Sequence, residues 1–176
     1  MCQILENNFM HLNLETNRLI IRPISIDDHG FILKLVNTEG WLKYIGDMNV
    51  NNDQDAKNYI QKILDREGKG CFYGVFEDKH TKIPMGIVTF LNRETQAYPD
   101  MGFATLPQFE GFGYTLEASQ AFLDKLLSDH NDISKIIAIT KTDNLRSINL
   151  IKKLGFEYFD TDVMDHQLSI YMILKN

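Results

Sequence analysis

Apolar residues in the first third of the chain change from a strand-like run to helical spacing. Residues 19–21, Leu-Ile-Ile, form a short apolar run that Pro23 closes, because proline cannot donate to a sheet ladder. Ser25 and Asp28 have the spacing of a capping box, which predicts a helix start, and a second helix is predicted after Asn52. The apolar faces expected for these helices are Phe31, Ile32, Leu35 and Val36, then Ala56, Tyr59, Ile60, Ile63 and Leu64.

Strand signals follow in close succession through the middle of the chain. Gly68 and Gly70 are expected to end the second helix, and strands are predicted over 71–77, 83–92 and 97–105. Short connections of this kind favour antiparallel neighbours.

The last third alternates helices with strands. The segment 135–140 contains the continuous apolar run Ile-Ile-Ala-Ile, which is typical of a strand buried on both faces of a sheet. A helix capped by Asp143 or Asn144 is predicted to stop at Gly155, a residue suited to a helix C-terminus. The expected elements are, in order, a helix over 113–129, a strand over 135–140, the capped helix, and strands over 156–159 and 167–175 that pair as a hairpin across 160–166.

The pattern predicts a single domain of mixed α/β class. Its expected order is strand, two helices, three strands, helix, strand, helix and two strands, spanning residues 1–176, with 1–13 as a mobile or peripheral leader. The chain has 176 residues, of which 44% are hydrophobic and 24% charged, and this suffices for one sizeable core.

Charge and cysteine content narrow the function classes. The net charge is −6 and no Lys/Arg run exceeds Lys152-Lys153, which argues against nucleic-acid binding. Apolar stretches fall short of the roughly 20 residues of a membrane helix, and the N-terminus lacks secretory-signal features, so we expect a cytoplasmic protein. Cys2 and Cys71 make no disulfide framework or metal spacing, and Cys71 fits a small buried hydrophobe; no metal is expected.

A Gly-containing loop between a predicted strand and helix is the main chemical signal. It reads Gln108-Phe109-Glu110-Gly111-Phe112-Gly113. Free amides at a helix N-terminus bind anions, and Gly111 and Gly113 would let a pyrophosphate approach the backbone. A tight turn into a helix explains the same residues equally well. Walker and dinucleotide patterns both fit poorly, the second because Leu116 stands where it requires glycine.

The surroundings of this loop resemble the GNAT superfamily of N-acetyltransferases. Gln108-x-x-Gly111-x-Gly113 is similar to that family's acyl-CoA loop, Q/R-x-x-G-x-G/A. The matching segments, in order over about residues 14–174, are 16–23 with Asp27-Asp28, the strand 100–107, the helix start 113–118, Asn144-Leu145-Arg146-Ser147, and Lys153-Leu154-Gly155-Phe156. The similarity is greatest to the branch containing the ribosomal-protein N-terminal acetyltransferases.

The chain departs from that branch at three positions around the loop. Glu110 stands where Trp is common, Phe112 where Lys is frequent, and Leu116 where Thr is usual. Losing a lysine and gaining a carboxylate beside phosphates should weaken binding. Backbone amides would then supply most of the binding to the phosphates.

The resemblance implies a GNAT fold, acetyl-CoA as cosubstrate, and direct attack by an amine in a ternary complex without an acyl-enzyme. It implies that the backbone of Phe103, Ala104 and Thr105 pairs with the pantetheine arm. The amides of Gly111, Phe112, Gly113 and Tyr114 would meet the pyrophosphate, bordered by Gln108.

The helix after Asn144 carries further candidates from the resemblance. Asn144 would contact coenzyme A, or simply cap its helix. Ser147 lies one helical turn on and would protonate the leaving thiolate, or be a solvated surface residue. Arg146 and Lys153 would serve the phosphates, or be solvated helix charges.

The general base is left open between several residues. Asp100 shares a strand face with Gly102 and either accepts the amine proton or pairs with a neighbouring cation. Tyr171 is a second candidate, although a buried strand tyrosine is usually structural. His166, in a polar turn, is expected to be exposed and idle.

The segment 38–52 is predicted as a loop or irregular helix, and in the family it walls the acceptor site. Its Trp41, Tyr44 and Asp47 would shape that pocket, while a core anchor is an equal alternative for the aromatic residues.

The predicted function is acetyl transfer from acetyl-CoA to a primary amine, either a peptide N-terminus or a small molecule. The alternatives are an acyl-CoA-binding sensor or regulatory module that lacks turnover, and an interaction protein whose Gly loop is only a turn. Net acidity mildly favours a cationic acceptor through steering. Monomer and homodimer both remain open.

Overall fold

The computed structural model describes residues 12–66, 70–93, 96–130, 133–161 and 167–175. The expected leader lies mostly outside these residues, as do Gly68, most of the 160–166 turn and His166. Among the described residues, no helix combines the length and apolar character needed to cross a membrane.

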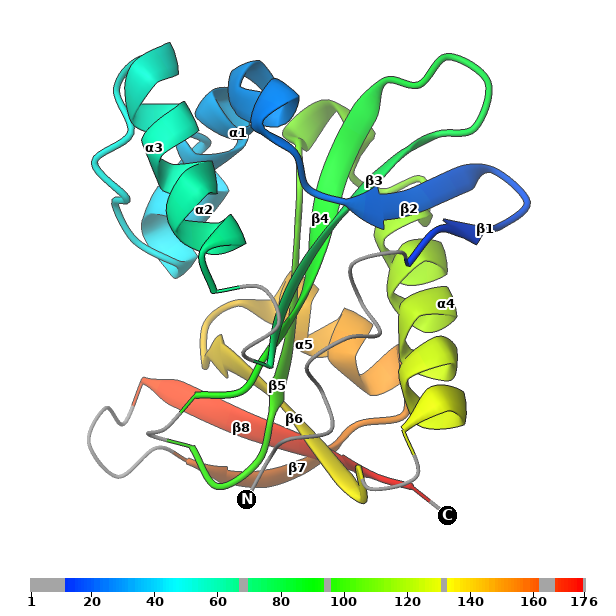
Figure 1. Ribbon diagram of the computed structural model, residues 1–176. Helices are drawn as coiled ribbons and strands as arrows, with labels where there is room; N and C mark the ends of the chain where they lie inside the picture. The colour runs from blue at the N-terminus through cyan, green and yellow to red at the C-terminus, as the bar shows by residue number, and fades with distance from the viewer. Residues whose placement is uncertain (1–11, 67–69, 94–95, 131–132, 162–166, 176) are drawn as a thin grey trace.

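A single mixed sheet forms the centre of the described chain (Figure 1). Its strands lie in the spatial order β1-β2-β3-β4-β5-β6-β8-β7, and all pairs are antiparallel except β5 with β6. The strand bounds are β1 Leu14–Glu15, β2 Leu19–Pro23, β3 Cys71–Asp78, β4 Pro84–Leu91, β5 Asp100–Thr105, β6 Lys135–Lys141, β7 Glu157–Thr161 and β8 Leu168–Leu174.

Helices cover both faces of this sheet. Figure 1 shows α1, α2 and α3 grouped on one side, with α4 and α5 on the other. The bounds are η1 Ile26–Asp28, α1 His29–Val36, α2 Glu39–Tyr44, α3 Asp53–Leu64, η2 Pro107–Phe109, α4 Tyr114–Asp129 and α5 Leu145–Lys153, where η marks a 3-10 turn. The fold is therefore the mixed α/β layer structure that the pattern predicts.

Strand register divides the core into two apolar clusters. Directly paired residues project to the same face. Val75 therefore joins Ile87 in the cluster under α1–α3, while Phe72 joins Phe90 in the cluster under α4. Phe122 of α4 is fully buried in the second cluster and stacks on Phe72, with ring centroids 5.2 Å apart. Each helix layer is thus held by its own side of the sheet.

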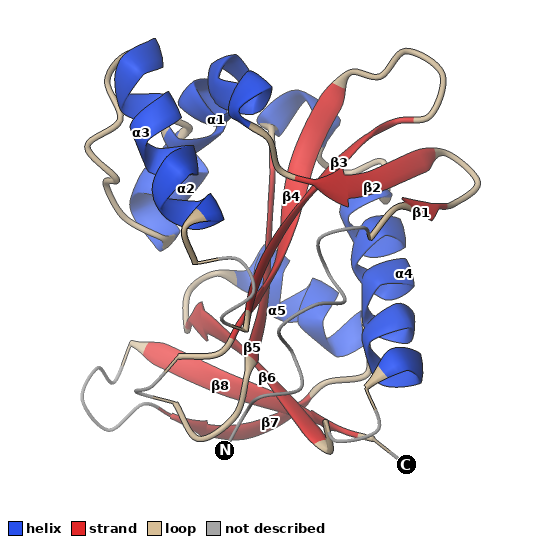
Figure 2. Cartoon of the chain, viewed as in Figure 1, coloured by secondary structure: helices blue, strands red, loops and turns tan. Residues whose placement is uncertain are grey.

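The parallel pair β5–β6 is held together only at one end. The register joins Asp100 to Ile137, and the Ile137 amide donates to the Pro99 carbonyl at 2.9 Å. By contrast, β4 pairs with β5 along its whole length, from Leu91–Asp100 to Gly86–Thr105. Beyond the shared end, β6 runs obliquely to β4 and β5 (Figure 2). The sheet therefore forks toward the C-terminal ends of β5 and β6.

Four local predictions need adjustment. The segment before Asp100 is bent, so β5 begins there rather than at Ala97. A short strand β1 was not predicted, and α2 gives helical order to part of segment 38–52. Gly113 is the N-cap of α4, so that helix begins at Tyr114. The expected helix starts near Ser25 and after Asn52 are confirmed, since the Asp28 carboxylate accepts from the Ser25 amide at 2.8 Å and the Asn52 side chain caps α3.

Candidate functional site

A row of free amide donors opens α4. Gly111 and Gly113 have φ values of 82° and 80°, a left-handed conformation that glycine adopts without steric cost. Within the described chain, the amide hydrogens of residues 111–116 have no hydrogen-bond acceptor. Alternating backbone of this kind, followed by a helix N-terminus, gives a concave anion-binding surface. The loop thus has the features of the predicted anion site.

The fork beside this loop exposes one edge of β5. Leu106 donates its amide to the Met85 carbonyl of β4 at 2.8 Å, and Pro99 accepts from β6. Because backbone groups alternate direction along a strand, the odd-numbered residues between them face the gap. Phe103 and Thr105 therefore direct their backbone into the fork. The backbone of Ala104 faces β4, and its side chain packs on the cluster under α1–α3.

The end of β5 is tied directly to the first turn of α4. The hydroxyls of Thr105 and Thr115 are 2.6 Å apart and share a hydrogen bond. Gln108 lies between them in the chain, exposed within η2. The loop amides and the open edge of β5 thus belong to one continuous site.

An ion pair connects the loop with α5. The Arg146 guanidinium donates to the Glu110 carboxylate, bridging segments far apart in the sequence. The carboxylate that departs from the family pattern is therefore neutralised by a partner. The Arg146 side chain is 86% exposed, so solvent and salt can weaken the pair.

The start of α5 shows one residue acting as a cap. The Asn144 side-chain oxygen accepts the Ser147 amide at 3.2 Å, so Asn144 caps α5, while its contact with coenzyme A stays a prediction. The half-buried Ser147 hydroxyl makes no hydrogen bond within the described residues. Lys153 ends the helix, about 14 Å along its axis from Asn144, and is exposed. No contact among the described residues brings Lys153 to the loop.

Asp100 occupies the closed end of the fork. Its side chain is 8% exposed and lies 2.6 Å from the Arg93 Nε atom, so it does pair with a cation. Burial raises the pKa of Asp100 above its ordinary value, and Arg93 opposes that rise. Register places Asp100 on the α1–α3 face together with Tyr73, whose own pKa is raised by burial. Arg93 was not predicted from the sequence.

Two other aromatic candidates lie in the core. Tyr171 is buried in the cluster under α4 and meets Tyr158 edge-on, with ring centroids 5.8 Å apart. Trp41 is buried in the cluster under α1–α3, which makes it a core anchor. Tyr44 is half-buried at the end of α2 and Asp47 is exposed. The Lys141 ammonium donates to the Lys43 carbonyl at 2.8 Å, which holds α2 against the end of β6.

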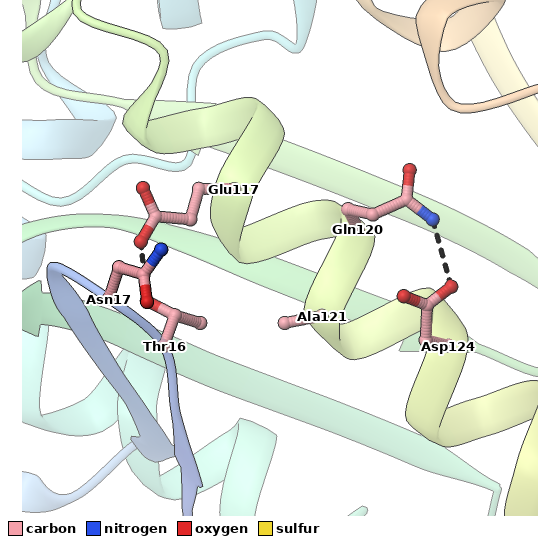
Figure 3. A pocket seen from close by; sticks show the side chains of 6 residues that line it. All are labelled: Thr16, Asn17, Glu117, Gln120, Ala121 and Asp124. Atoms are coloured by element: carbon pink, nitrogen blue, oxygen red, sulfur yellow. Dashed lines mark hydrogen bonds between the residues drawn. The ribbon is translucent and has the colours of Figure 1, made fainter.

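A shallow surface depression lies on the outer side of α4 (Figure 3). Its lining includes the carboxylates of Glu117 and Asp124 and lacks a cationic side chain, so it suits a polyanion poorly. Among the described residues, no cluster of His, Cys, Asp or Glu is suited to a metal ion.

Comparisons with known proteins identify the family and the fold. A family model described as an acetyltransferase (GNAT) domain matches residues 18–157. The chain is 30% identical over 172 residues to YjdG, an N-acetyltransferase of Bacillus subtilis (strain 168), covering 90% of this chain and 94% of that protein. It is 26% identical over 144 residues to YnaD, another N-acetyltransferase of that strain, covering 82% of each.

Solved structures with low sequence identity share the fold. RimL, a ribosomal L7/L12 α-N-protein acetyltransferase solved in complex with coenzyme A, aligns with a TM-score of 0.78 at 13% identity, covering 93% of this chain and 98% of RimL. MccE, a microcin C7 self-immunity acetyltransferase solved with acetyl-CoA and AMP, aligns at 0.75 and 18% identity, covering 90% of this chain and 93% of MccE.

Proposed function

The chain belongs to the GNAT acetyltransferase family, and from that premise we propose that it transfers acetyl from acetyl-CoA to a primary amine by direct attack. The proposal is supported by two structural features that lie next to each other. A row of free amides, residues 111–116, lies beside the open edge of β5. The amides suit a pyrophosphate, and the edge suits the amide groups of a pantetheine arm.

The coenzyme would lie along the fork with its phosphates at α4. The amides of Gly111, Phe112, Gly113 and Tyr114 would donate to the pyrophosphate, bordered by Gln108. The backbone of Phe103 and Thr105 would pair with the pantetheine arm, whereas Ala104 would contribute only packing. Support comes from the coenzyme complexes of RimL and MccE, which share this fold.

At the start of α5, Asn144 would act indirectly, by fixing the first turn that carries Ser147. Arg146 and Lys153 are the two candidate cations of α5 for the phosphates, and both side chains are exposed. Arg146 is the better placed, because it already reaches the loop through Glu110.

Acetyl transfer needs a neutral amine, a polarised carbonyl and a proton for the thiolate. The amine nitrogen would attack the thioester carbon, forming the C–N bond while the C–S bond breaks. The Phe103 amide would stabilise the oxyanion, because it points into the fork. Ser147 would donate a proton to the departing sulfur, since its hydroxyl has no described partner, and would regain a proton from solvent water.

Asp100 would take the proton that the amine releases. It lies where the two strands still pair, on the face covered by α1–α3 rather than by α4. An acceptor entering from that face would meet the thioester from the side opposite to α4. Only the carboxylate form of Asp100 accepts a proton, and the ion pair with Arg93 favours that form by opposing the rise in pKa that burial causes.

The acceptor is proposed as a class: a primary amine on a peptide N-terminus or on a small molecule. RimL, which shares the fold, is by name an α-N-protein acetyltransferase of a ribosomal protein, and this supports a peptide N-terminus as one member of the class. The segment that holds α2 against β6 would form one wall of the acceptor site.

The test is the release of coenzyme A thiol from acetyl-CoA in the presence of a panel of peptide and small-molecule amines. We expect release that depends on one acceptor class and yields the acetylated amine by mass spectrometry. Saturable acetyl-CoA binding with no release across the panel would favour a sensor or regulatory module. Absence of any thermal stabilisation by acetyl-CoA would favour a protein whose glycine loop is only a turn.

A further inference from the structure

Arg18, directly before β2, binds the start of α4 on the side opposite to the free amides of residues 111–116. Its Nη1 atom donates to the Phe112 carbonyl at 3.0 Å, and its Nε atom donates to Glu117 at 2.6 Å. Its guanidinium carbon lies 4.4 Å from the centroid of the Tyr114 ring. One side chain therefore fixes three successive parts of the loop and helix start.

The direction of the bond to Phe112 decides what this contact does. A trans peptide unit points its carbonyl and its amide hydrogen in opposite directions. The Phe112 carbonyl shares its peptide plane with the Gly113 amide. A donor on that carbonyl therefore fixes the plane and turns the Gly113 amide hydrogen away from Arg18, outward into the row of free donors. Hydrogen bonding at the carbonyl also polarises the amide, which makes it a stronger donor.

Arg18 is itself held by an anchored carboxylate. Glu117 accepts from the Thr16 hydroxyl at 2.6 Å and from the Arg18 backbone amide at 3.0 Å, besides the guanidinium. Figure 3 shows the Glu117 side chain reaching from α4 toward the turn that carries Thr16 and Asn17. Burial acts to raise the pKa of Glu117, but the bonds from Thr16 and Arg18 outweigh it and keep that pKa below its ordinary value. The anchor therefore stays ionised at neutral pH.

We propose that Arg18 is a positioning residue for coenzyme binding: anchored by Glu117, it orients and polarises the Phe112–Gly113 peptide toward the pyrophosphate. This inference rests on the proposed function, because it assigns the amide row to the coenzyme. It explains how a loop with Phe112 in place of lysine still presents positive charge to phosphates. The charge acts through the backbone, from the side of the loop opposite to the ligand.

The experiment compares two ligands that differ in their phosphates. Dissociation constants are measured by titration calorimetry for acetyl-CoA and by NMR titration for S-acetylpantetheine, which has no phosphate. We expect Arg18→Gln to raise the Kd for acetyl-CoA about tenfold, the loss of one charge-assisted hydrogen bond. The ratio of the two Kd values should shift by the same factor, since only one ligand carries the pyrophosphate. A structural defect would weaken both ligands and leave that ratio in place, which would overturn the proposal.

Glu117→Gln separates positioning from a simple field effect. Removing a carboxylate near a polyanion should tighten binding if only long-range charge matters. If Glu117 anchors Arg18, the same change should weaken acetyl-CoA binding severalfold. Tighter binding by Glu117→Gln would therefore overturn the proposal.

Lys79 supplies a matched control on the same sheet edge. Its backbone amide donates to the Arg18 carbonyl at 2.9 Å, while its ammonium pairs with Glu15, away from the loop. Lys79→Gln removes a neighbouring cation and should change the Kd for acetyl-CoA less than about twofold, as expected for a surface charge. An equal loss in Lys79→Gln and Arg18→Gln would contradict positioning. Failure of the parent protein to bind acetyl-CoA would instead count against the proposed function itself.

Discussion

Replacing Gly111 with valine separates the binding role of the loop from its contribution to stability. A Cβ at Gly111 would meet no atom within 4 Å, so the substitution causes no steric clash. The cost is conformational, because φ is +82° and an L residue in the left-handed region loses about 1–2 kcal/mol. For a domain of this size, that corresponds to a fall in Tm of about 2–8 °C.

The effect on ligand binding should be larger than the effect on folding. Valine returns the loop toward negative φ, and this turns neighbouring amides away from the pyrophosphate. Each lost hydrogen bond to a charged group is worth about 1.5–3 kcal/mol, so one lost bond weakens binding by tenfold or more. We expect titration calorimetry to show at least a tenfold rise in the Kd for acetyl-CoA while circular dichroism shows a folded domain.

Gly46 provides the matched control, because it combines positive φ with open space. Its φ is +120°, and a Cβ there would also meet no atom within 4 Å. Gly46→Val should therefore lower Tm at least as much as Gly111→Val, yet leave the Kd for acetyl-CoA within about twofold. Binding of acetyl-CoA by Gly111→Val as tight as by the parent, or an equal loss of affinity in Gly46→Val, would refute the backbone role of Gly111.

Four further substitutions test other parts of the site. Ser147→Ala should lower kcat by about 10²–10⁴-fold, the range of general acid catalysis, and leave the Kd for acetyl-CoA nearly unchanged; equal kcat in both proteins removes Ser147 from the mechanism. Glu110→Gln removes a negative charge beside the loop and should tighten acetyl-CoA binding a few-fold at low salt, whereas Arg146→Gln removes a positive charge and should weaken it. Both effects should be small, since exposed charges contribute about 1 kcal/mol or less. Calorimetry at two salt concentrations checks this, and a salt-independent Kd would contradict it. Asp100 must be ionised to accept a proton, so the acid limb of a kcat/KM pH profile should lie above the ordinary aspartate pKa, because burial raises the pKa of Asp100. Arg93→Gln should move that limb to still higher pH, because Arg93 opposes the rise, and an unmoved limb excludes Asp100 as the base.

Local periodicity was enough to predict the order of most elements, because each depends on residues close together in sequence. The capping box at Ser25 and Asp28, the cap at Asn144 and the glycines at 111 and 113 all act within one helical turn. The same glycine spacing pointed to the left-handed backbone of the loop, since glycine adopts that conformation at little cost, while the anion site itself stays a prediction.

The fork and the ion pairs could not be predicted in this way. Whether β6 stays paired with β5 depends on packing between strands about 35 residues apart in sequence, which no local pattern encodes. Arg18 contacts Phe112 across 94 positions of sequence, and an arginine directly before a strand does not by itself indicate such a partner. The sequence predicts that successive residues of β5 direct their backbone groups to opposite sides. Which residues face β4 depends on the hydrogen bond from Leu106 to Met85, which the sequence does not reveal. That bond distinguishes Ala104 from Phe103 and Thr105.

The central claim is that the amides from Gly111 onward hold the pyrophosphate of acetyl-CoA. The most direct measurement is a ¹H–¹⁵N correlation spectrum titrated with acetyl-CoA and, separately, with S-acetylpantetheine. The amides of Gly111 and Gly113 should shift strongly with acetyl-CoA and much less with S-acetylpantetheine, since only the first ligand carries phosphates. Unmoved Gly111 and Gly113 amides at saturating acetyl-CoA, with the main shifts elsewhere, would contradict the claim.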